Sequence, residues 1–169
     1  MDYQVAGLPL HILVVHFVAI VVPLAALCLV LSTAWPAARR RLGIVTPIIA
    51  FAALVSVPVA TTQAGEWLAA RVHQTALIDA HVAIGKSLLP WAFATFALAA
   101  LQWAWFRYFA APTSRYFVRV RSRAIRIGIT SALAILVAVA AAGSVISVVV
   151  IGESGSRAVW TNSYTQNPR

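Results

Sequence analysis

The chain has 169 residues, 62% of them hydrophobic, with a mean hydropathy of +0.87. A soluble domain is only about half apolar, so this excess cannot all be buried in one aqueous core. The formal charge of +9 would suggest nucleic acid as a partner of a soluble protein. Here the basic residues lie between apolar stretches, which favours a lipid bilayer as the partner and argues against nucleic acid. The single cysteine, Cys28, excludes an internal disulfide or a Cys-x-x-Cys metal site.

Four apolar stretches are long enough to cross a membrane, since a spanning helix needs about 20 mostly apolar residues. In chain order they cover approximately residues 8–34, 44–63, 77–106 and 124–151. Isolated strands cannot satisfy their backbone hydrogen bonds in lipid, so all four stretches are predicted to be helices. The predicted fold is an all-α, polytopic four-helix membrane bundle formed by residues 1–151, followed by a polar tail formed by residues 152–169.

The arginines are distributed unevenly among the segments that connect these spans. The first and third connections hold no acidic residue and nine arginines, namely Arg39, Arg40, Arg41, Arg107, Arg115, Arg119, Arg121, Arg123 and Arg126. Cytoplasmic loops carry an excess of Lys and Arg. Both connections are therefore predicted to lie in the cytoplasm, where anionic lipid headgroups are their partners. This orientation places both termini, and the polar tail with them, outside.

Ionisable side chains inside a membrane span are costly, and each is a candidate functional residue. The sequence predicts a polar pocket that opens outward and contains His11, His16, His81, Lys86, Asp79, Glu66 and Ser144. At about 1.5 Å per residue, His11 on the first span and His81 on the third lie at one depth. His16 and Lys86 lie at a second depth, about 7.5 Å further in. We therefore expect His11 close to His81, and His16 level with Lys86 in a deeper layer.

The same residues also have simpler structural interpretations. His11 lies near enough to the interface to be a solvated residue at a helix start, and His16 could bond a hydroxyl such as that of Ser144. Lys86 could extend outward to Asp79 or Glu66 without any further role. Small residues on the fourth span, namely Gly143, Ser144 and Ser147, are typical of close helix packing.

Three short motifs resemble a family of small bacterial membrane proteins known as domain of unknown function 2231. They are "GLPLHILVVHF" at the first span, "TTQAGEW" at the end of the second and "DAHVAIG" at the start of the third. The resemblance covers about residues 5 to 150 and includes the histidines at 11, 16 and 81. This chain has Ile12 where many members have proline after the first histidine. The resemblance implies a multi-pass protein of the bacterial plasma (inner) membrane, and it implies no activity.

Three classes of function remain open. The first is an accessory or structural subunit of a larger membrane complex, with other membrane subunits as partners. The second is a haem b- or metal-binding electron-transfer subunit, because neutral imidazoles are good ligands for haem iron and for transition metals. Its candidate ligands are His11, His16 and His81. The third is a small transporter or proton relay that uses His16, Lys86 and Asp79. An enzyme is less favoured, because the sequence contains no nucleophile–base pair, phosphate loop or paired carboxylates.

Overall fold

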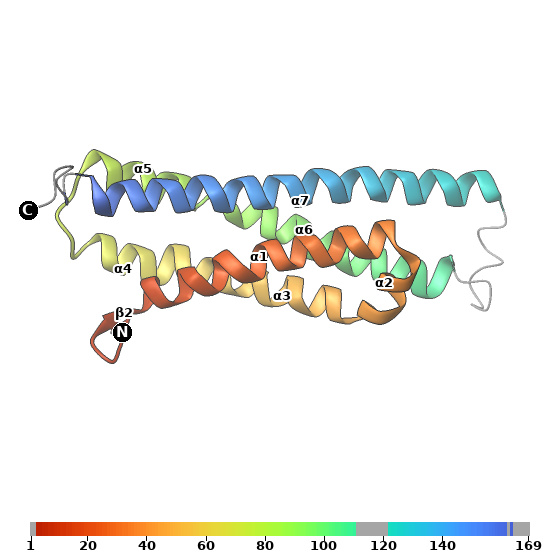
Figure 1. The fold of residues 1–169 in the computed structure, drawn as a ribbon, viewed down its shortest axis with the longest axis horizontal. Coiled ribbons are helices and arrows are strands. Elements are labelled where there is room, and N and C mark those ends of the chain that lie inside the picture. The colour runs from red at the N-terminus through yellow and green to blue at the C-terminus, as the bar shows by residue number, and fades with distance from the viewer. Residues whose placement is uncertain (1–2, 111–121, 162, 164–169) are drawn as a thin grey trace, which may run out of the picture.

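The computed structural model describes residues 3–110, 122–161 and 163 of the chain. This part is predominantly helical, as predicted. A short hairpin of β1 (Gln4–Val5) and β2 (Leu8–Pro9) precedes the first helix. The helical elements in Figure 1 are α1 (Leu10–Ala34), α2 (Pro36–Leu42), α3 (Val45–Pro58), the π-helical η1 (Val59–Ala64), α4 (Gly65–Ala69), α5 (Ala76–Gly85), α6 (Leu88–Ala104), the π-helical η2 (Trp105–Phe109) and α7 (Arg123–Trp160).

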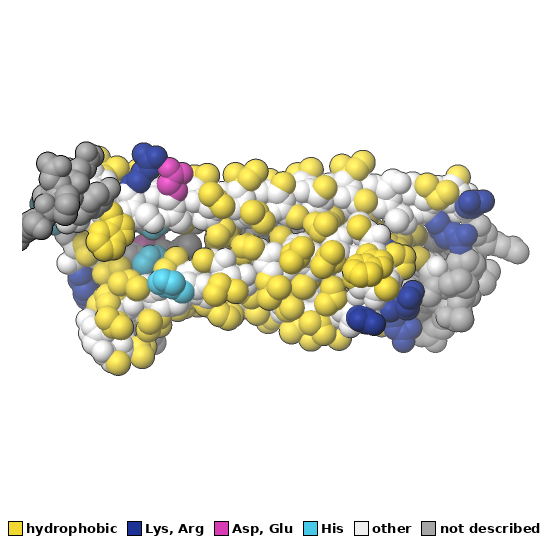
Figure 2. All heavy atoms as spheres, viewed as in Figure 1, with side chains coloured by type: hydrophobic (Ala, Val, Ile, Leu, Met, Phe, Trp, Pro, Cys, Tyr) yellow, Lys and Arg dark blue, Asp and Glu magenta, His cyan; other side chains and the backbone are white. Residues whose placement is uncertain are grey.

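Three helical segments are long and apolar enough to cross a membrane: Leu10–Ala34, Ala76–Phe109 and Arg123–Trp160. A fourth would be formed if α2 and α3, which are bent by 67° at the turn between them, count as one span. Large apolar side chains on the outer faces remain exposed, such as Ile20 at 69% and Ile135 at 65%. Apolar atoms cover most of the middle of the molecule in Figure 2. An apolar surface of this extent fits lipid rather than water as the surrounding solvent.

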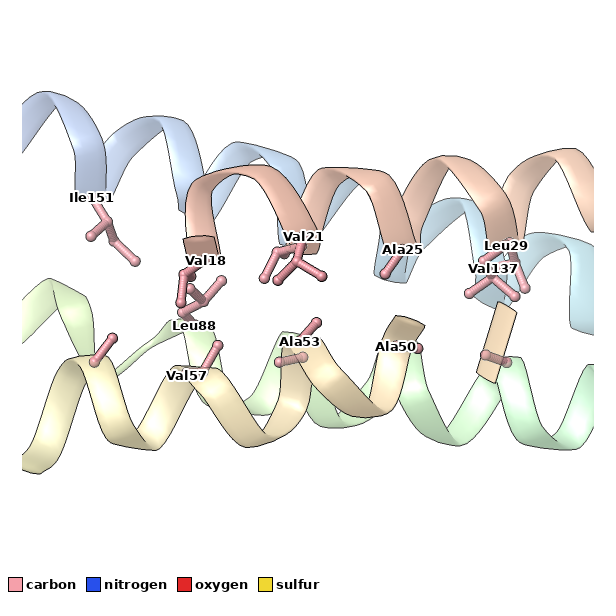
Figure 3. Close-up of a cluster of buried hydrophobic side chains, with 14 residues drawn as sticks. Val18, Val21, Ala25, Leu29, Ala50, Ala53, Val57, Leu88, Val137 and Ile151 are labelled. Atoms are coloured by element: carbon pink, nitrogen blue, oxygen red, sulfur yellow. The ribbon is translucent and has the colours of Figure 1, made fainter. Parts of the chain in front are cut away.

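The long helices pack against one another around one apolar core. α1 contacts both α3 and α7, α6 contacts the same two helices, and α5 lies against α7. Figure 3 shows side chains of α1, α3 and α7 that point into this core, including Val21, Leu29, Val57 and Val137. Many of the remaining core residues are alanines, and small side chains allow helix backbones to approach closely in a membrane protein.

The contact between α6 and α7 depends on two small residues, as the sequence predicted. A Cβ atom on Gly143 would lie 2.4 Å from atoms of the Trp91 ring, so only glycine fits there without movement of a neighbour. Ser144 is fully buried, and its hydroxyl lies 2.9 Å from the hydroxyl of Thr95 on α6. Ser144 is therefore a packing residue in the middle of the helices.

The third predicted span consists of two consecutive helices. Proline lacks an N–H group, and its ring clashes with the carbonyl four residues earlier, which for Pro90 is the carbonyl of Lys86. α5 accordingly ends at Gly85, and α6 begins at Leu88. The hydroxyl of Ser87 donates to the carbonyl of Ile84 at 2.7 Å, which satisfies one acceptor at the break.

Two helices extend beyond the limits of the spans predicted from the sequence. Helical structure continues from the second span through α4 to Ala69, into the connection predicted between the second and third spans. The helix that contains the predicted fourth span continues beyond residue 151, because α7 extends to Trp160 through the first half of the predicted polar tail. An ion pair between Glu153 and Arg157, at 2.6 Å and one helical turn apart, supports this extension.

The molecule has two chemically different ends. The N-terminal hairpin, α4, α5 and the last turns of α7 lie at one end, which we call the histidine end; α2 and the first turns of α7 form the arginine end (Figure 1). Basic side chains gather at the arginine end, and histidines lie toward the other (Figure 2). Arg115, Arg119 and Arg121 lie outside the described residues.

Arg39 connects three elements at the arginine end. Its Nε donates to the carbonyl of Ser32 at 2.6 Å, and a terminal nitrogen donates to the carbonyl of Thr33 at 2.7 Å. The guanidinium group also lies over the Phe106 ring, 3.4 Å from its centroid. Because the last carbonyls of a helix lack partners within it, these bonds cap α1 and fasten α2 to it.

Candidate functional site

His11 lies in the first turn of α1 and is held against the second span. The hairpin before it is tied down by a hydrogen bond from the Leu10 amide to the Tyr3 carbonyl, at 2.8 Å. The Nδ1 atom of His11 lies 2.8 Å from the carbonyl oxygen of Ala60 in η1. A Cβ atom on Gly65 would lie 3.3 Å from this Nδ1, so a glycine on α4 makes room for the imidazole ring.

His81 lies on α5 and is held in the same manner by α7. Its Nδ1 lies 2.9 Å from the hydroxyl oxygen of Ser154, and that hydroxyl lies 2.8 Å from the carbonyl oxygen of Ile151. A Cβ atom on Gly155 would lie 3.0 Å from His81 Cε1, so a glycine again lies against the imidazole ring. The helical extension beyond residue 151 thus supplies both residues that position His81.

The two hydrogen bonds determine which nitrogen of each ring carries the proton. A carbonyl oxygen can only accept, so His11 Nδ1 donates to Ala60. The Ser154 hydroxyl donates to the Ile151 carbonyl and therefore accepts from His81 Nδ1. Both neutral rings are then protonated on Nδ1, which leaves a lone pair on each Nε2. A hydrogen bond from the distal nitrogen to a protein acceptor is the arrangement that orients metal-ligating histidines.

The structure brings these two imidazoles together, as the comparison of depths predicted. The ring centroids are 6.3 Å apart, and the ring planes make an angle of 80°. Both residues are partly buried. The pair and its supports come from α1, η1, α4, α5 and α7, so helices far apart in the sequence meet at this point. We call His11 and His81 the histidine pair.

A surface ion pair lies at the same end of the molecule. Lys86 Nζ is 3.4 Å from Glu66 Oε1, and both side chains are more than half exposed. The sequence suggested Asp79 or Glu66 as the partner of Lys86, and in the structure the ion pair is with Glu66. Asp79 is exposed in the first turn of α5.

His16 and Lys86 do not line an inner layer of a polar pocket, because both side chains are exposed. His16 is exposed, and its Nδ1 donates to the carbonyl of Ile12 on its own helix. Residues five apart on a helix differ by about 140° in direction, so His16 points away once His11 faces the neighbouring helices. The Ser144 hydroxyl bonds Thr95 and the Trp91 carbonyl. It therefore is not a hydrogen-bond partner of His16 and does not line an outward-opening pocket.

The histidine pair places two imidazole rings, each with an Nε2 lone pair, at a centroid separation of 6.3 Å. No group of three or more His, Cys, Asp or Glu residues suited to a metal ion occurs among the described residues. A haem iron needs only two axial ligands from the protein, and a metal ion would fill its remaining positions with water or another ligand. The arrangement suits coordination chemistry, because each Nε2 lone pair is fixed in place by a bond on the other side of its ring.

The sequence did not reveal the residues that support the pair. Ala60 contributes a backbone carbonyl, which has no signature in a sequence. Ser154 and Gly155 lie in a stretch whose polar, glycine-containing composition predicted a tail. Gly155 is a small residue of the kind that permits close helix approach, and it lies against His81, whereas a Cβ on Gly152 would meet nothing within 4 Å.

No protein-family model, no curated protein and no solved structure matches this chain. The resemblance to domain of unknown function 2231 therefore stays a prediction.

Proposed function

We propose that the chain is a four-helix membrane bundle of the bacterial plasma membrane, with its histidine end outside and its arginine end in the cytoplasm. The distribution of arginine supports this orientation, because arginines concentrate in the connections at one end of the molecule. In this arrangement α2 with α3, and α5 with α6, each make one span.

The orientation is tested with single cysteines in a background where Cys28 is replaced by Ala. A cysteine in place of Arg40 should resist a membrane-impermeant maleimide added to whole spheroplasts, and one in place of Ser156 should react. Both should react after the membrane is permeabilised. The opposite pattern in intact spheroplasts would overturn the proposed orientation.

For its function, we propose that the protein is a membrane subunit that holds a transition-metal centre between His11 and His81. The observation that carries this proposal is the adjacent pair of imidazoles, each with Nδ1 bound to the protein and Nε2 left as a ligand. The centre is either the iron of haem b or a single metal ion such as copper or zinc. Iron or copper held by two imidazoles would make the protein an electron-transfer subunit.

The experiment uses the full chain purified in mild detergent. The metal content is measured by elemental analysis and the haem content by the reduced-minus-oxidised visible spectrum, before and after incubation with haemin, Cu or Zn. The parent should bind about one equivalent of one of these. His11→Gln and His81→Gln should each weaken binding by about tenfold or more, the range seen when a metal ligand's environment is disturbed.

The matched control is His16→Gln, because His16 lies at the same end but faces away from the pair. It should bind as the parent does. An equal loss in His16→Gln would mean that binding is nonspecific. A parent that binds neither haem nor either metal ion would overturn the function, while the topology would be untouched.

The second candidate is an accessory subunit of a larger complex. Its support is the end of α7, where Val159 and Trp160 remain exposed at 63% and 60%. Such side chains beyond the apolar part of a span suit contact with another subunit. If this candidate holds, replacing both by Ser should reduce the mass of the particle extracted in mild detergent. The proton relay through His16, Lys86 and Asp79 lacks comparable support, because within the described residues the hydrogen bond of His16 is to Ile12 of its own helix.

A further inference from the structure

The first turns of α7 present a polar face toward the end of α6 and η2. Arg123, Arg126, Ile127 and Thr130 follow one another at intervals of three, one and three residues, so they share one side of the helix. With Ser131 and Ala110 they line an open cavity of about 390 Å³.

The described lining suits an anion. It contains two guanidinium groups and two hydroxyls, and none of the described lining residues is acidic. Trp105 Nε1 lies 3.2 Å from Thr130 Oγ1, and an indole nitrogen can only donate. Thr130 therefore accepts from Trp105, and its own hydroxyl hydrogen is oriented away from that bond. Arginine forks match phosphate oxygens in geometry as well as in charge.

The depth of the cavity matches the headgroup layer of a bilayer. Thr130 lies level with Trp105, and two neighbours of Trp105 in the chain, Trp103 and Tyr108, form an aromatic pair with ring centroids 5.7 Å apart. Trp and Tyr are the residues that mark the boundary between hydrocarbon and headgroups. Arg123 is seven residues nearer the end of α7, or about 10 Å at 1.5 Å per residue. The headgroup region is about 5–8 Å thick on each side, so the cavity extends across the phosphate layer.

We propose that this cavity is a binding site for the phosphate headgroup of an anionic phospholipid in the leaflet at the arginine end. Arg123 and Arg126 bind the phosphate, while Thr130 and Ser131 donate to its oxygens from the hydrocarbon side. Ile127 lies between them, where it contacts the upper part of an acyl chain. Basic pockets at this depth between membrane helices are suited to phosphate-rich lipids. The site is independent of the histidine pair, which lies at the other end.

The test is thermal unfolding of the full chain in a zwitterionic detergent, titrated with short-chain phosphatidylglycerol, cardiolipin, phosphatidylcholine or inorganic phosphate. Phosphatidylglycerol or cardiolipin should raise the melting temperature with a saturable, single-site dependence, and phosphatidylcholine should not. The double variant Arg123→Gln/Arg126→Gln should weaken the lipid's apparent affinity by about tenfold or more, because two charge-assisted contacts are lost. Thr130→Val should weaken it by a smaller factor.

The matched control is Arg40→Gln/Arg41→Gln, which removes the same charge from the same end of the molecule outside the cavity. It should retain the parent affinity. Equal losses in the two double variants would overturn the proposal, because they indicate diffuse attraction by charge. Saturation by inorganic phosphate as tight as by the lipids would also overturn it, since the site would then bind a free anion. A lower melting temperature without lipid identifies a folding defect, and the single variants Arg123→Gln and Arg126→Gln then decide the affinity.

Discussion

Ser154 is the residue through which the helical extension of α7 acts on the histidine pair, and Ser154→Ala removes that link. Its hydroxyl accepts the Nδ1 proton of His81 at 2.9 Å and donates to the Ile151 carbonyl at 2.8 Å. Alanine keeps the helix but removes the acceptor. The form of His81 protonated on Nδ1 is then less favoured, and a protonated Nε2 cannot bind a metal.

The magnitude follows from the chemistry of such supporting bonds. Loss of the partner that orients a metal-ligating histidine lowers metal affinity by about 10- to 100-fold. This corresponds to about 1.4–2.8 kcal/mol of binding free energy. The folded state loses one hydrogen bond between side chains, worth about 0.5–1.5 kcal/mol net. The variant should therefore fold, and its defect should appear in binding more than in stability.

The assay is a competition titration of the bound metal or haem against a chelator or apo-acceptor of known affinity, on protein in mild detergent. Ser156→Ala is the matched control, because Ser156 is exposed two residues further along the same helix. Ser154→Thr should retain most of the affinity, since it keeps the hydroxyl. Affinity of Ser154→Ala within twofold of the parent would refute the reasoning, as would an equal loss in Ser156→Ala.

Two further predictions concern the packing of the helices and the surface ion pair. Gly143→Ala should lower stability by about 1–3 kcal/mol, because the new Cβ would lie 2.4 Å from the Trp91 ring. Gly128→Ala on the same helix meets nothing within 4 Å, so it should be neutral or stabilising in the same thermal unfolding assay. Lys86→Met should change stability by less than about 1 kcal/mol, because the pair with Glu66 is exposed. A larger loss of unfolding free energy, measured by denaturant titration, would contradict this expectation and would show that the ion pair holds α4 to α5.

The sequence predicts the spans because length and apolar content suffice to identify a helix in lipid. It also predicts the histidine pair, since the rise per residue of a helix is fixed and two residues can be compared in depth. It does not predict which faces meet, because depth leaves the rotation of each helix open. His16 is an example: its angular offset from His11 shows that the two residues do not share a face, but not which of them faces the other helices. Because His11 faces η1 in the structure, the offset of about 140° places His16 on the outer surface.

The errors at the ends of the helices have a common physical cause. The composition of residues 152–160 is polar and contains glycine, which by itself favours a loop. Packing against α5 overrides this preference, because Gly155 lets the His81 ring approach and Ser154 bonds it. The break at Lys86 and Ser87 could have been predicted, since Pro90 removes the partner of the Lys86 carbonyl. The extension of α7 and the break in the third span are linked in the structure. The break produces the short helix α5, which contacts α7, and α6 continues the span. The short α5 thus gives His81 its own helix, and the position of the histidine pair depends on Pro90 as well as on the histidines themselves.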